Sequence, residues 1–189
     1  MSRANDAIMS GGSPPFSTFA LRVTTCHVVT YFIAGVFAVT VLDYRGIFAS
    51  EALACFMRPV ADPFVALGPT FQVGRGLILA ATLFPFRRVF LGAPRGWLLL
   101  WGLFLGLAIL SPVGPSPGSV EGFIYTKVPI RLQMIGWFEA LPQTLAFSTL
   151  VVAWHTRPHR AWTWGMAGLC AIVVLLSVAG YFAAIQHHV

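Results

Sequence analysis

Long apolar stretches with most charges at their ends constrain this chain more than any other feature. The stretch from Val23 to Leu42 contains no Asp, Glu, Lys or Arg, and it is bounded by Arg22 and Asp43. A helix needs roughly 20 apolar residues to cross the hydrocarbon of a bilayer. Only 10% of the 189 residues are charged, against about 25% in soluble domains. The sequence therefore predicts an all-α, polytopic integral membrane protein.

The length of the chain leaves room for about five spanning helices in one bundle. The apolar runs are too long, and alternate too little, for the strands of a membrane barrel. We expect a flexible cytoplasmic tail over residues 1–20, which is no cleaved signal peptide, and a single transmembrane helical domain over residues 21–189. The expected spans are 23–42, 69–86, 97–110, 134–154 and 162–185, and the expected outer loops are 43–68 and 111–133.

The first outer loop is predicted to carry a short interfacial helix. Residues Ile47 to Met57 can form about three helical turns with Glu51 on the wet side. Pro59 and Pro63 prevent the helix from continuing. Two alternative topologies stay open: four spans if the short third segment is re-entrant, and six spans if Ile47 to Met57 inserts together with part of the next segment.

Lysines and arginines are more numerous on the side of the N-terminus than on the other side. With five spans, seven of them fall on the cytoplasmic side and five on the outer side or the outer helix ends. Because cytoplasmic loops carry the excess of Lys and Arg, this favours a cytoplasmic N-terminus and an extracytoplasmic C-terminus in a cell membrane, such as a bacterial inner membrane. The six tryptophans lie near proposed helix ends, as an aromatic belt requires.

Two charges fall inside the predicted spans, Arg75 in the second and Glu139 in the fourth. A charge in hydrocarbon is costly unless it is paired or faces a cavity. Both residues lie at matching depth, and each shares a helix face with an amide, Gln72 or Gln143. Pro142 adds to the polarity, because its missing N–H frees a carbonyl beside Glu139. The sequence predicts a polar pocket open to the outer side.

The pocket has two interpretations, a structural ion pair between Arg75 and Glu139 and a ligand site. In the second, the loop over residues 111–133 is a lid. A cationic rim around Arg75 would suit an anionic ligand such as a lipid headgroup or a carboxylate, which acidic residues would orient. The expected ligand-binding residues are Arg58, Gln72, Arg75, Glu121, Lys127, Arg131, Glu139 and Gln143.

Three functions remain open from the sequence. The first is a non-enzymatic subunit or small-ligand or lipid-binding protein. The second is a membrane enzyme acting on a lipid-like substrate, with Glu139 as acid or base and Arg75 as anion clamp; no nucleophile motif accompanies them. The third is a b-type haem electron-transfer subunit ligated by His27 and His155, one from each of two helices. No cofactor is expected by default, and His187 and His188 are interpreted as solvated tail residues.

The expected partner is the lipid bilayer. Gly102 and Gly106 form a GxxxG, and the fifth span carries regularly spaced alanines, so either can pack against another helix of this chain or of another membrane subunit. The basic residues do not line one polar face, which argues against nucleic-acid binding. The three cysteines show neither a disulfide framework nor zinc spacing.

Overall fold

A computed structural model describes residues 14–186, and this part of the chain is helical, with no strand. His187 and His188 lie outside the described residues. Five long helices are joined by four short ones. The long helices are α2 (Phe16–Val41), α5 (Gly68–Leu83), α7 (Gly96–Leu110), α9 (Ile130–Thr156) and α10 (Arg160–Gln186). The short helices are α3 (Tyr44–Phe48), α4 (Pro63–Ala66), α6 (Arg87–Leu91) and α8 (Val120–Tyr125).

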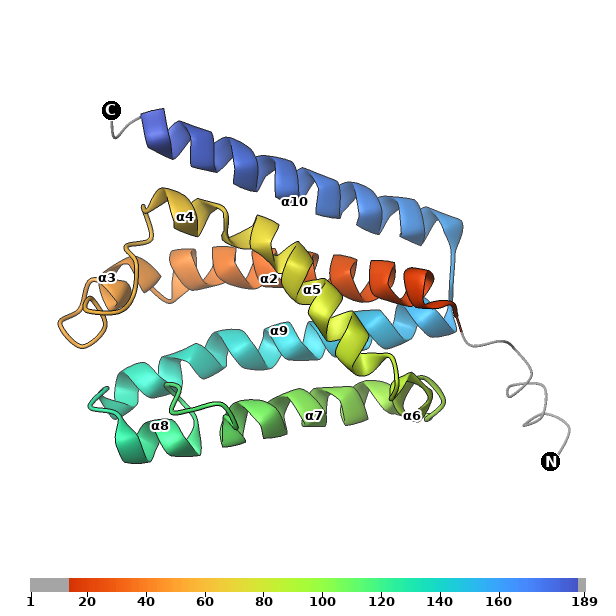
Figure 1. Ribbon diagram of the computed structural model, residues 1–189, viewed down its shortest axis with the longest axis horizontal. Helices are drawn as coiled ribbons and strands as arrows, with labels where there is room; N and C mark the ends of the chain where they lie inside the picture. Colours follow the sequence, from red (N-terminus) through yellow and green to blue (C-terminus); the bar gives the residue numbers. More distant parts are fainter. Residues whose placement is uncertain (1–13, 187–189) are drawn as a thin grey trace, which may run out of the picture.

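The long helices form a bundle in which successive helices run in opposite directions (Figure 1). Helix α2 lies in the middle and contacts α5, α9 and α10, whereas α7 packs on the far side of α9. Helix α5 crosses α2 obliquely (Figure 1). Helices α3, α4 and α8 lie at one end of the bundle, here called the α3 end, and α6 lies at the other, the α6 end (Figure 1).

The apolar core fills the half of the bundle next to α6. The first turns of α2 meet the last turns of α5 and α9 there, and the fully buried Phe19 and Trp154 are its largest members. Its remaining buried residues are Ala20, Val23, Cys26, Ala80, Leu83, Phe90, Leu100, Phe147, Val151 and Val152. The α3 half contributes none of them, and its buried residues include the polar His27, Thr30 and Gln72 beside small apolar ones such as Ala38.

Helices α2 and α5 approach each other most closely at Gly76. A Cβ at that position would lie 2.8 Å from the Cα of Thr24, a distance at which backbone and side chain collide. Only a glycine lets the two helices meet here. This contact fixes α5 on α2, and with it the height of Arg75, the neighbour of Gly76.

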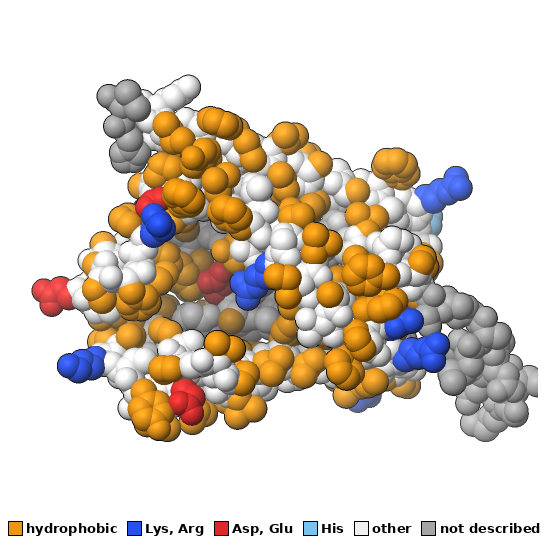
Figure 2. All heavy atoms as spheres, in the orientation of Figure 1, with side chains coloured by type: hydrophobic (Ala, Val, Ile, Leu, Met, Phe, Trp, Pro, Cys, Tyr) orange, Lys and Arg blue, Asp and Glu red, His pale blue; other side chains and the backbone are white. Residues whose placement is uncertain are grey.

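Two helices, α2 and α10, are long and apolar enough to cross a membrane, and α7 is apolar but shorter. Helix α10 buries little of itself, since Val173 and Ser177 are its buried residues, while Leu175 is 67% exposed. Apolar side chains cover the visible face of the molecule (Figure 2). Soluble monomers rarely expose so large an apolar patch, so these surfaces indicate association with a membrane.

The first helix begins earlier than the sequence indicated. Helix α2 starts at Phe16, so the tail expected over residues 1–20 is too long by several residues; residues 1–13 lie outside the described part of the chain. Phe16 and Phe19 stack edge-on against Phe84, with ring centroids 5.1 and 5.6 Å away. Phe19 is fully buried, whereas Phe16 stays 47% exposed, and the contacts of both rings with Phe84 extend the helix through the polar residues between them.

The interfacial helix expected over Ile47 to Met57 is also wrong in position. Helix α3 spans Tyr44–Phe48, and hydrogen-bonded turns come after it. Asp43 sets this start, because it adopts a left-handed conformation (φ 54°) and its carboxylate caps the amide of Gly46.

The remaining long helices occur where spans were expected, with shifted ends. Helix α9 starts at Ile130 instead of 134, directly after Pro129, which shortens the expected lid. Helix α5 ends at Leu83 instead of 86, and the chain then turns into α6. Helix α7 differs from the expected 97–110 by one residue and α10 from 162–185 by two residues at its start and one at its end.

Candidate functional site

Glu139 is held by a tyrosine from the first loop. The hydroxyl of Tyr44 donates a hydrogen bond of 2.6 Å to Oε2 of Glu139. A short bond of this kind to a carboxylate is among the stronger hydrogen bonds in proteins. It connects α3 with the first half of α9 and fixes the direction in which the carboxylate points.

The local backbone places Tyr44 at this point. Asp43 turns the chain by its left-handed conformation, which Asp tolerates better than most residues. A Cβ on Gly46 would lie 2.5 Å from Oδ2 of Asp43, so a larger residue here would have to displace the capping carboxylate. The chain leaving α2 is therefore folded back at once, and the first residue of α3 reaches α9.

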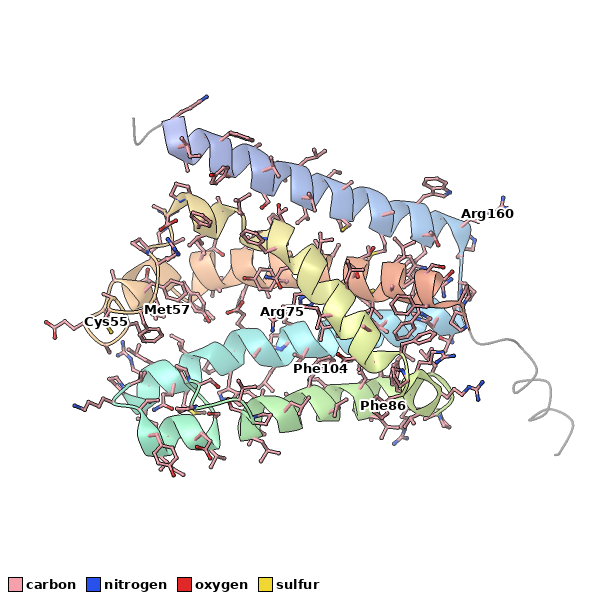
Figure 3. All side chains as sticks on the ribbon, viewed as in Figure 1. Cys55, Met57, Arg75, Phe86, Phe104 and Arg160 are labelled. Carbon is pink, nitrogen blue, oxygen red and sulfur yellow. The ribbon has the colours of Figure 1, made fainter. Side chains whose placement is uncertain are left out.

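Arg75 lies halfway along α5, with an exposed side chain that extends between α5 and α9 (Figure 3). The salt bridge within residues 14–186 joins Arg58 to Asp62. The expected ion pair between Arg75 and Glu139 is not confirmed, because no bond of 4.0 Å or less joins them, and Glu139 is bonded to Tyr44 instead. No described residue offers Arg75 a hydrogen bond.

Arg75 and Glu139 nevertheless face one space. Both charges act electrostatically on the hydroxyl of Tyr31, a half-buried residue of α2. Figure 2 shows a hollow in this part of the molecule, with an acidic and a basic side chain inside it, and the Arg75 side chain in Figure 3 extends to this place. We call this space, with Tyr31, Tyr44, Arg75 and Glu139 around it, the Arg75 hollow.

A buried polar contact between α2 and α5 lies next to the hollow. Nε2 of Gln72 donates to the carbonyl of Gly68, which leaves Oε1 to accept a 2.9 Å bond from Nε2 of His27. His27 therefore carries its proton on Nε2. Gln72 was expected to share the pocket with Arg75, and the structure instead engages it with His27.

The other predicted rim residues are not joined to Arg75. Arg58 pairs with Asp62 at 3.0 Å and lies over the ring of Phe64. Glu121 lies in α8, which packs against α7 and α9, Lys127 follows α8, and Arg131 is the second residue of α9. Within the described residues none of these three forms an ion pair with Arg75. Gln143 is half-buried, one turn after Glu139 in α9.

The loop before α9 is anchored away from the hollow. The amide of Gly118 donates to Oε1 of Gln133, and Nε1 of Trp137 donates to the carbonyl of Gly118. A cavity of about 200 Å³ lies between this loop, α7 and α9. The loop thus closes the α7 side of α9, and the expected lid over Arg75 is not shown.

The two histidines proposed as haem ligands lie at different levels. The His155 ring is 5.2 Å from that of Phe19, and Phe19 precedes His27 by eight residues of α2, about 12 Å of helix. Nδ1 of His155 bonds the carbonyl of Val151. Nε2 of His27, the usual ligand atom, is already bonded to Gln72. The haem hypothesis gains no support from this geometry, and residues 14–186 contain no group of three metal-binding side chains.

No family model, no curated protein and no solved structure matches this chain. Its function is therefore inferred from the hollow itself. The sequence identified the two charges of the hollow but missed Tyr31 and Tyr44. One signal for Tyr44 was present: Asp is a favoured N-cap residue, so Asp43, directly after an apolar helix, marks the start of a new helix at Tyr44.

Proposed function

We propose that the chain is a five-span membrane protein that binds a small anionic or amphipathic ligand in the Arg75 hollow. The antiparallel order of the five long helices supports five crossings. Helix α5 alone is about 24 Å long, shorter than the ~30 Å of hydrocarbon. Helix α4 precedes it directly and lengthens the segment, and a locally thinner bilayer accommodates the rest.

The charge distribution supports a cytoplasmic α6 end. Figure 2 shows basic side chains and no acidic ones at this end of the visible face. The acidic residues of the described chain belong to the other half. The arginines at the α6 end are Arg22, Arg87, Arg88, Arg95, Arg157 and Arg160. By the positive-inside rule, the N-terminus is cytoplasmic and the hollow faces the outer side.

The observation that carries the binding function is that Arg75 lacks a partner among the described residues. Insertion scales put the cost of an arginine at the centre of a spanning helix at about 2.5–3.5 kcal/mol. The described residues give Arg75 neither a hydrogen bond nor an ion pair, so the protein itself does not offset this cost. A guanidinium offers five N–H donors and matches carboxylate or phosphate oxygens. An anionic group in the hollow supplies the missing partner.

Native mass spectrometry of the protein extracted with its lipids tests this function. We expect the wild type to retain a small anionic or amphipathic molecule that Arg75→Gln loses. Arg160→Gln is the matched control, because Arg160 begins α10 at the opposite end (Figure 3), and it should retain the molecule. Equal retention by all three proteins, or no retention by any of them, would contradict a binding role for Arg75.

A further inference from the structure

The Arg75 hollow carries charges of opposite sign from two different helices. Arg75 comes from α5 and Glu139 from α9, and α2 packs against both helices. No ion pair of 4.0 Å or less joins the two charges in the described chain, and Figure 2 shows a hollow here with an acidic and a basic side chain inside it. A molecule that enters this space meets a cation on one side and an anion on the other.

Glu139 is prevented from turning to Arg75 but can still bind a ligand. Tyr44 holds its Oε2 at 2.6 Å, and Oε1 has no hydrogen-bond partner among residues 14–186. A carboxylate accepts up to about four hydrogen bonds. One oxygen therefore fixes the carboxylate, and the other stays available in the hollow.

We propose that the ligand is a zwitterion, whose anionic group binds Arg75 and whose ammonium group binds Glu139. This inference rests on the ligand-binding function proposed above and adds the second charge. A ligand with negative charge alone is repelled by Glu139, and one with positive charge alone by Arg75. Only a ligand that carries both charges is attracted by both walls, which is how like-charge repulsion excludes wrong partners.

Two sources supply this chemistry, the headgroup of a zwitterionic phospholipid and a small soluble zwitterion. The soluble source is tested by titrating the full-length protein with phosphoethanolamine, inorganic phosphate and ethanolamine at constant ionic strength. We expect phosphoethanolamine to bind at least about tenfold tighter than phosphate, and ethanolamine to bind more weakly still. Glu139→Gln keeps the bond from Tyr44 and should bind phosphoethanolamine and phosphate with about equal affinity. Arg75→Gln should abolish binding of both.

The lipid source is tested by native mass spectrometry from nanodiscs that contain equal amounts of phosphatidylethanolamine and phosphatidylglycerol. We expect the wild type to retain phosphatidylethanolamine several-fold over phosphatidylglycerol, and Glu139→Gln to retain both equally. A preference in one arm alone supports the proposal and identifies the source. Absence of a preference for the zwitterion in both arms overturns the proposal. If phosphate or phosphatidylglycerol then still binds in a way that requires Arg75, the anion-binding function proposed above is supported without the zwitterion.

A direct salt bridge is the remaining account of the two charges. In that case the double variant Arg75→Glu/Glu139→Arg restores the thermal stability lost in each single variant, and the wild type shows no binding in either arm. That result would overturn the zwitterion and the binding function together. We expect instead that the double variant stays as unstable as the single ones, since Tyr44 cannot fix an arginine as it fixes Glu139.

Discussion

Tyr44 is the residue on which the geometry of the hollow most depends. Replacing it by Phe removes one hydroxyl and leaves the ring in place. The expected loss of stability lies between about 0.6 kcal/mol, the average for side-chain hydrogen bonds in membranes, and about 3 kcal/mol, the upper value for a charged acceptor. The bond length of 2.6 Å favours the upper half of this range. Thermal unfolding of the purified protein measures the loss.

Tyr125 is the matched control for this substitution. It ends α8, is 69% exposed, and its hydroxyl has no hydrogen-bond partner in the described part of the chain. Tyr125→Phe should change the unfolding temperature by no more than the error of the measurement. An equal effect of the two substitutions would show that the bond to Glu139 contributes nothing to stability.

The same bond gives the stability a dependence on alkaline pH. Burial, together with the bond to Glu139 and its negative charge, raises the pKa of Tyr44 above its ordinary value. The folded state therefore retains the phenolic proton longer than the unfolded state, whose tyrosine titrates near pH 10. The stability difference between wild type and Tyr44→Phe should be constant from pH 7 to about pH 10 and then shrink as the pH rises through the folded-state pKa.

At the scale of elements, the contact between α2 and α5 decides where Arg75 stands. Gly76→Ala places a Cβ 2.8 Å from the Cα of Thr24 and forces the helices apart, which costs about 1–3 kcal/mol by overpacking. Gly74→Ala is the control, because nothing lies within 4 Å of its Cβ position. It should be neutral, or stabilising by up to about 1 kcal/mol, as expected for Gly to Ala in a helix.

In the variants Gly76→Ala and Gly74→Ala, thermal stability and ligand retention should change together. Gly76→Ala moves α5, so we expect it to weaken both, whereas Gly74→Ala leaves both as in the wild type. If Gly76→Ala is as stable as Gly74→Ala, α2 and α5 do not meet in the way the structure describes.

The helices themselves were largely predictable, and their ends less so. Helix α7 agrees with the expectation within one residue, because a Gly- and Pro-rich turn precedes it and Ser111-Pro112 comes directly after it. The start of α2 was missed because Ser17 and Thr18 look polar in sequence, whereas the two phenylalanines around them contact Phe84 edge-on. These contacts depend on a residue about 65 positions away and cannot be read from local composition.

The charges of the candidate site were predictable from the sequence, but the tyrosine that holds one of them was not. Arg75 and Glu139 stand out because charges are rare inside apolar helices. The partner of Glu139 does not stand out, since Tyr44 is 95 positions away and reaches it only through the cap formed by Asp43 and Gly46. Sequence can thus identify a costly charge, while the group that holds it depends on tertiary structure.

At the scale of the whole molecule, the two halves of the bundle differ in character. The half near α6 holds the apolar core and the arginine-rich end, whereas the half near α3 holds the hollow. In the topology proposed above, this arrangement would place a packed base on the cytoplasmic side and a polar space that opens outward. The central claim is therefore that water reaches Arg75 from the outer side alone.

Cysteine accessibility at position 75 in intact cells tests that claim most directly. In a Cys55→Ser background, which removes the exposed native thiol, Arg75→Cys should react with a membrane-impermeant maleimide added outside. Leu77→Cys is the control, because Leu77 is 50% exposed on the same helix but lies two residues, about 160° around the helix, from Arg75, and it should not react. Labelling of position 75 only after the membrane is opened, or equal labelling of both positions, would contradict the account.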